Sequence, residues 1–97
     1  MMTPYLFSFN ATMGTRQQVL TYLDSLPQVL NWYAVLPEAV IIISRQSSSK
    51  LSDLIHQRYP LSYFIIAEIP RDNNNGWLPK TAWDFINNPK SSGRWEP

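Results

Sequence analysis

Residues 39–44, with the sequence Ala-Val-Ile-Ile-Ile-Ser, constrain the fold of this chain more than any other segment. β-Branched side chains favour extended backbone, so we expect a strand here. Side chains alternate between the two faces of a strand, and both faces of this one are apolar. Ala39, Ile41 and Ile43 share one face, and Val40 and Ile42 share the other. Such a strand needs a cover on each face of its sheet.

The segment from Tyr63 to Ile69 has the same two-sided character. Its two faces are Tyr63, Ile65, Ala67 and Ile69 on one side and Phe64, Ile66 and Glu68 on the other. Two further segments show the period of a strand, residues 5–9 with alternating aromatic side chains and residues 32–36. We therefore expect four strands in a sheet whose second face is nearly as apolar as its first.

Two helices are expected between these strands. The first begins at Thr15, where Thr15 and Gln18 fit a capping box, and it ends near Pro27. The second begins at the serines of residues 47–49, which are good helix caps, and it ends at Pro60. The short connection between the second and third strands favours an antiparallel hairpin.

The resulting order is strand, helix, strand, strand, helix, strand, which is that of the ferredoxin-like split βαβ fold. We predict an α+β protein with an antiparallel βαββαβ sheet, two helices on one face and a C-terminal helical appendage. Residues 1–86 are expected to form a single ferredoxin-like domain that includes the appendage, and residues 87–97 a tail. The appendage is a short helix expected at residues 80–87.

Two covers for the second sheet face are open. The C-terminal segment folds back over the sheet as a lid, or two subunits pack sheet to sheet as a homodimer. The lid or interface residues would be Trp77, Leu78, Trp83, Phe85 and Ile86.

The composition excludes several classes of function. Only 15% of the residues are charged, against roughly 25% in an average protein. The net charge of +1 is too small for a protein that binds mainly by neutralising phosphates. The chain has no cysteine, so thiol catalysis and thiolate zinc sites are excluded. The longest apolar run, residues 39–43, is far shorter than the ~20 residues of a membrane-spanning helix, and the N-terminus is a poor signal peptide, so we expect a cytoplasmic protein.

The loop from Asn10 to Arg16 is a candidate anion site. It lies between the first strand and a helix N-terminus, where free amides attract anions, and Arg16 adds a positive charge. An ordinary capped loop without a ligand is the alternative.

A second candidate is the loop from Arg71 to Leu78, which holds Asn75 and Trp77. It is either a recognition loop with Trp77 as its aromatic anchor, or a turn that places Trp77 as a plug on the sheet. The predicted binding residues of the two loops are Asn10, Arg16, Arg71, Asn75 and Trp77.

Catalytic and metal-binding groups are not predicted. His56 is the one histidine and falls on the polar side of its helix, so we expect it on the surface. The carboxylates are isolated in the sequence, and those of Asp24, Asp53 and Asp84 are interpreted as solubilising charges on helices. No residue pattern indicates a metal, a cofactor or an enzymatic activity.

The order of elements over about residues 5–70 resembles the small CRISPR-associated ferredoxin-like ribonucleases and the virulence-associated protein D family. This resemblance implies a dimer joined through the open sheet face, with the C-terminal segment helping the junction. In that family an acidic residue at the end of the first strand places a metal. After Tyr5-Leu6-Phe7-Ser8-Phe9 the matching position here is Asn10, a poor magnesium ligand, so nuclease activity is not implied.

The sequence favours a non-enzymatic interaction module of microbial or mobile-element type, forming a homodimer through the second sheet face. The alternative is a nucleic-acid-binding domain or degenerate nuclease. That alternative would use Arg16, Arg45, Arg58 and Arg71.

Overall fold

The computed structural model describes residues 1–72 and 74–90. Along these residues, four strands and three α-helices follow one another, with one turn of 3₁₀ helix, η1, at Ala11–Met13. The strands are β1 (Thr3–Phe9), β2 (Asn31–Leu36), β3 (Ala39–Ser44) and β4 (Phe64–Glu68), and the helices are α1 (Arg16–Ser25), α2 (Ser48–Arg58) and α3 (Lys80–Asn87).

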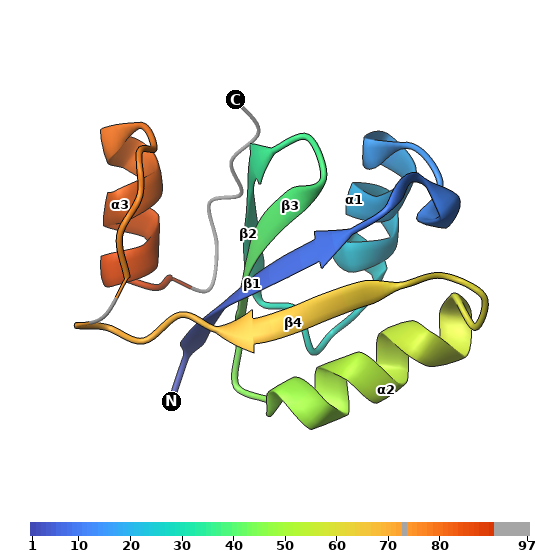
Figure 1. The fold of residues 1–97 in the computed structure, drawn as a ribbon. Coiled ribbons are helices and arrows are strands. Elements are labelled where there is room, and N and C mark those ends of the chain that lie inside the picture. Colours follow the sequence, from blue (N-terminus) through green and yellow to red (C-terminus); the bar gives the residue numbers. More distant parts are fainter. Residues whose placement is uncertain (73, 91–97) are drawn as a thin grey trace.

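The strands form one antiparallel sheet in the order β2-β3-β1-β4. Helices α1 and α2 lie on one side of this sheet and α3 lies on the other (Figure 1). The protein is thus an α+β protein with a four-stranded antiparallel sheet and three helices, as its sequence predicts at that level. No helix in the described part of the chain is both long and apolar enough to cross a membrane.

The predicted elements agree with the observed ones to within a few residues. β1 begins at Thr3 rather than at Tyr5, and β4 is shorter than the predicted segment 63–69. Helix α3 covers residues 80–87 as expected. Most of the predicted tail, residues 91–97, lies outside the described residues.

The first core lies between the sheet and the pair α1 and α2. Side chains of every second residue in β1 form its centre, with Phe7 fully buried and its ring centroid 5.2 Å from that of Phe9 and 5.8 Å from that of Phe64. Val40 and Ile42 of β3 point into the same core. The alternating aromatic side chains of residues 5–9 therefore point from one face of the strand into this core.

The second core lies on the opposite face of the sheet, under α3. It consists of the buried residues Tyr33, Ile41, Ile43, Ala82, Phe85 and Ile86. The ring of Phe85 packs edge to face on that of Tyr33, with 5.5 Å between the ring centroids. The two-sided character of residues 39–44 is thus explained, because every residue of β3 is buried between two layers of helices.

The capping box at the start of α1 is confirmed. The Thr15 hydroxyl accepts from the Gln18 backbone N–H, and Gln18 Oε1 accepts from the Thr15 backbone N–H at 2.8 Å. Gly14 makes room for this return contact, because its φ is 113° and a Cβ there would lie 2.5 Å from Gln18 Oε1.

Replacing the cap with Thr15→Ala is expected to lower the free energy of unfolding by about 1 kcal/mol, since the Gln18 N–H loses its partner. Urea unfolding followed by circular dichroism measures this loss. Thr21→Ala, an exposed position on the same helix, serves as the control and should change stability by less than about 0.5 kcal/mol. Equal losses for the two variants would contradict the role of the cap.

Candidate functional site

Helix α3 covers only half of the second sheet face. One row of paired residues runs across all four strands, with Tyr33 next to Ile41, Ile41 next to Leu6, and Leu6 next to Ala67. Tyr33 and Ile41 are 3% and 1% exposed, whereas Leu6 is 38% exposed and Ala67 is exposed as well. On the neighbouring row Ile65 of β4 is 62% exposed. The β1–β4 half of this face, which we call the open half-face, therefore has no cover within the described part of the chain.

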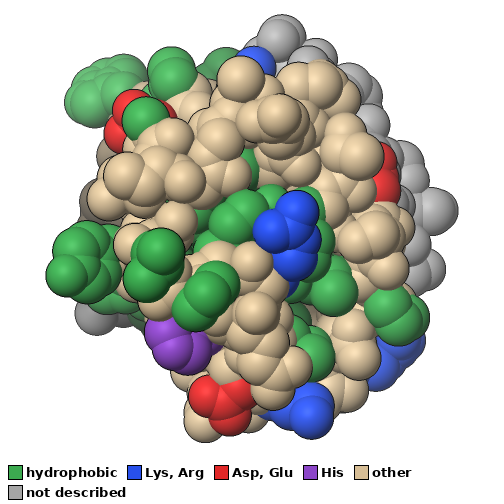
Figure 2. All heavy atoms as spheres, turned by 90° about the vertical axis from the view of Figure 1, so that its right-hand side faces the viewer, with side chains coloured by type: hydrophobic (Ala, Val, Ile, Leu, Met, Phe, Trp, Pro, Cys, Tyr) green, Lys and Arg blue, Asp and Glu red, His purple; other side chains and the backbone are tan. Residues whose placement is uncertain are grey.

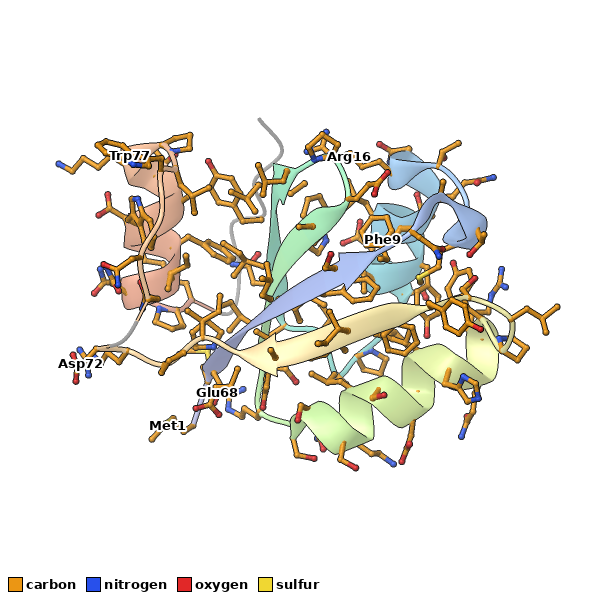
Figure 3. The ribbon with its side chains drawn as sticks, in the orientation of Figure 1. Met1, Phe9, Arg16, Glu68, Asp72 and Trp77 are labelled. Carbon is orange, nitrogen blue, oxygen red and sulfur yellow. The ribbon has the colours of Figure 1, made fainter. Side chains whose placement is uncertain are left out.

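A groove of about 550 Å³ separates the open half-face from the C-terminal segment. Its floor includes Leu6, Ile41 and Ala67, and its opposite wall includes Trp77 and Trp83. In Figure 3 it extends between the labelled residues Glu68, at the end of β4, and Trp77, near the start of α3. Of the described residues that line it, Glu68 alone is charged.

Trp77 does not plug the sheet, and that interpretation of the loop is wrong. Its side chain is fully exposed on the rim of the groove. Of the other residues predicted for the lid or interface, Phe85 and Ile86 are buried, and Leu78 and Trp83 pack partly buried against the same cluster. Trp77 is not part of that cluster, although it directly precedes Leu78 in the chain.

Polar contacts fasten the C-terminal segment to β2. The Tyr33 hydroxyl and the Thr81 hydroxyl lie 2.9 Å apart, and buried Asn31 donates from Nδ2 to the carbonyl of Lys90 at 3.0 Å. Residues 88–90, assigned to the tail, are thus held against the sheet at Lys90. The position of α3 over β2 and β3 is therefore defined by hydrogen bonds as well as by apolar packing.

Asn10 caps η1. Its Oδ1 accepts from the Thr12 backbone N–H at 3.1 Å and also from the Thr12 hydroxyl. The Thr12 hydroxyl in turn lies 3.1 Å from the Ser62 hydroxyl, which ties the loop to the start of β4. The side-chain oxygen of Asn10 is therefore used within the loop itself.

Arg16 does not supply charge to the loop that precedes it. Its Nη2 donates to the Ala34 carbonyl at 2.6 Å, in the stretch between Tyr33 and Leu36 where the pairing of β2 with β3 is irregular. Its Nε is buried and has no hydrogen-bond partner among residues 1–72 and 74–90. The prediction that Arg16 serves the Asn10 loop is wrong, because the side chain reaches back over the sheet edge.

A different arginine lies beside this loop. Arg58, from the last turn of α2, lines a hollow of about 690 Å³ together with Thr12, Gly14 and residues of α1. We call it the helical hollow; its lining residues are Thr12, Met13, Gly14, Gln17, Gln18, Thr21, Tyr22, Ser25, Arg58 and Tyr59. Figure 2 shows this side of the molecule, where hydrophobic side chains reach the surface and a basic side chain lies among them near the centre. Sequence reasoning missed this grouping because Arg58 and the loop are more than 40 residues apart.

Aromatic contacts hold Arg58 in place. Its guanidinium lies 4.8 Å from the centroid of the Tyr59 ring, a cation–π contact. The Tyr59 ring packs edge to face on Tyr22, with 5.1 Å between centroids, and the Tyr22 hydroxyl donates to the Leu54 carbonyl. Burial raises the pKa of Tyr22 above its usual value, and the neighbouring Tyr59 raises that pKa further, while Arg58 lowers it. The Tyr22 hydroxyl thus stays neutral at physiological pH.

The other candidate residues are spread over the molecule. Arg71 and Asn75 line one hollow beside α3, on a loop where Asn74 Nδ2 donates to the Pro70 carbonyl at 2.6 Å. Arg71 and Arg58 line different hollows, and Arg45 is exposed after β3. The four arginines of the nucleic-acid alternative are therefore not gathered into one of these hollows.

His56 is exposed, as predicted. Asp53 and Asp84 are exposed as well, and so is Asp24, which in addition makes a contact with the core. Its Oδ1 accepts from the indole N–H of buried Trp32 at 2.9 Å, which satisfies a polar atom at the edge of the first core. Within residues 1–72 and 74–90, no group of three or more His, Asp or Glu side chains comes together as a metal site would require.

Comparisons of the chain with protein-family models, with curated proteins and with solved structures give no match.

Proposed function

We propose that this protein is a non-enzymatic interaction module of the ferredoxin-like, split βαβ type, and that it forms a homodimer through the open half-face. The strand order β2-β3-β1-β4 and the two helices on one side of the sheet support the fold. The observation that supports the homodimer is the exposed apolar surface beside α3.

The chemistry of the open half-face is that of an interface core. Leu6 and Ile65 are exposed on the sheet, and Trp77 is fully exposed on the facing wall of the groove. Interface cores are enriched in tryptophan and depleted of charged residues, and Glu68 is the single charge among the described residues of the groove. Contiguous apolar surface of this kind is uncommon on a monomer.

A second copy of the chain is the occupant that fits this surface best. A two-fold axis would set the open half-face of one copy on that of the other, so each apolar patch covers its equivalent. Trp77 alone contributes ~150–250 Å² when buried. Burial of the exposed aliphatic side chains Leu6 and Ile65 adds to this area. For comparison, each partner buries ~800 Å² in an interface of standard size. We therefore expect a dimer of moderate affinity.

Sedimentation equilibrium of the full chain and of two variants tests the dimer. Wild-type protein at ~100 μM is expected to be mainly dimeric, as for a dissociation constant in the micromolar range. Ile65→Lys places a charge in the centre of the open half-face and should give a monomer at the same concentration with an unchanged circular dichroism spectrum. Leu61→Lys, at a side chain that is 92% exposed and lies before β4, outside the open half-face, is the matched control and should stay dimeric.

Two results would overturn the proposal. One is a wild-type chain that remains monomeric at this concentration. The other is a dimer that Ile65→Lys leaves intact, since the interface would then lie elsewhere on the molecule.

A further inference from the structure

The helical hollow carries one uncompensated positive charge. Arg58 is the single charged residue among the described ones that line it, and Arg58 forms no ion pair within the described part of the chain. Its contact with the Tyr59 ring orients the guanidinium, and no residue in the described part of the chain accepts a hydrogen bond from its N–H donors. An arginine held in this way is suited to a phosphate or carboxylate, which its planar fork binds through two parallel hydrogen bonds.

The walls of the hollow are rich in neutral hydrogen-bonding groups that remain free. Gln17 and Thr21 lie one turn apart on α1, and neither side chain has a hydrogen-bond partner in the described residues. Gln18 uses its Oε1 in the capping box, so its amide N–H₂ remains as a donor. These groups match the hydroxyls of a sugar better than they match an apolar ligand.

The charge for such a ligand comes from Arg58 and not from the helix terminus. The Gln18 backbone N–H at the start of α1 is already bonded to Thr15, and the Thr15 N–H is bonded to Gln18. The site therefore combines the neighbouring elements η1 and α1 with the end of α2, which is more than 30 residues farther along the chain. Its volume of about 690 Å³ is within the ~300–1,000 Å³ of pockets that hold small molecules.

We propose that the helical hollow binds a small phosphate ester that carries hydroxyl groups, of the sugar phosphate class. Arg58 binds the phosphate, while Gln17, Thr21 and the Gln18 amide bind hydroxyl groups. This site lies on the opposite side of the sheet from the open half-face, so the proposal does not depend on the homodimer (Figure 1).

Titration of the ¹⁵N-labelled full chain with ribose 5-phosphate, followed by NMR, tests the site. Saturable shifts are expected at the backbone amides of Thr12, Gly14 and Gln18 and at the Arg58 side-chain N–H. Arg58→Gln should weaken binding about tenfold or more, because a charge-assisted pair is lost. Arg45→Gln, which removes an exposed arginine elsewhere, is the matched control and should bind as the wild type does.

Inorganic phosphate and ribose, titrated separately, test the two halves of the ligand. Each is expected to bind the wild-type chain at least about tenfold more weakly than ribose 5-phosphate, as two linked contacts require. Inorganic phosphate that binds as tightly as the ester would overturn the role of Gln17 and Thr21. No saturable shift with ribose 5-phosphate, or equal affinity in Arg58→Gln with an unchanged melting temperature, would overturn the site itself.

Discussion

Phe7→Ala is expected to lower the free energy of unfolding by about 3–5 kcal/mol, a large part of the ~5–15 kcal/mol that stabilises a typical domain. Phe7 is fully buried at the centre of β1 and packs on the rings of Phe9 and Phe64. Alanine leaves a cavity that the two flanking strands, both hydrogen-bonded to β1, have little freedom to close. Guanidinium unfolding followed by fluorescence measures the loss.

Leu6→Ala provides the matched control for Phe7→Ala, because the two residues are neighbours on one strand. Leu6 points to the opposite face of the sheet and is 38% exposed. Its truncation removes less buried surface and should cost below about 2 kcal/mol when measured on dilute, monomeric protein. If both variants lost the same free energy, the first core would not be the main source of stability.

Phe85→Asp is expected to release α3 from the sheet. Phe85 is 6% exposed and packs on the ring of Tyr33, so a carboxylate at this position would be buried without a positive partner. The helix can avoid that cost only by leaving the sheet, which exposes Tyr33, Ile41 and Ile43. We expect a loss of about 3 kcal/mol or more in unfolding free energy and strong binding of a hydrophobic dye.

Limited proteolysis distinguishes release of α3 from general unfolding. The protease should cut the connection between β4 and α3 faster in Phe85→Asp than in the wild type. The four strands of the sheet should remain resistant to cleavage in both proteins. Trp77→Asp is the control, since this side chain is fully exposed and its replacement removes no packing within one chain. A protected connection in Phe85→Asp would show that α3 is not held by this contact.

The order of the elements is predictable from this sequence because each has a local signal. Thr15 and Gln18 form the capping box that their spacing predicts, and α1 begins directly after it. Pro60 follows the end of α2, and the alternating aromatic residues of β1 point to one core. Such signals lie within a few residues of the elements that they define, so no tertiary information is needed to interpret them.

The composition of the candidate sites is less predictable because it depends on contacts between distant segments. Arg16 is adjacent to the predicted anion loop in sequence, yet its side chain bonds to the Ala34 carbonyl. Arg58 enters that neighbourhood from the end of α2, which only the packing of the helices determines. Similarly, the two-sided apolar pattern of β3 and β4 predicts a cover but not its extent, and α3 is long enough to cover only two of the four strands.

The central position of β1 has a consequence for synthesis of the chain. β1 pairs with β3 and with β4, and the β4 pairing joins Tyr5 to Glu68, residues more than 60 positions apart. At a translation rate of ~5–20 residues per second, the aromatic side chains of β1 wait several seconds for β4 to be made. The sheet therefore cannot be completed strand by strand in the order of synthesis. β1 is made before the other three strands, but it gains its second neighbour only when β4 has been made. Before β4 is synthesised, β1 lacks its second neighbour, and at this stage the protein is more exposed to aggregation or to capture by a chaperone.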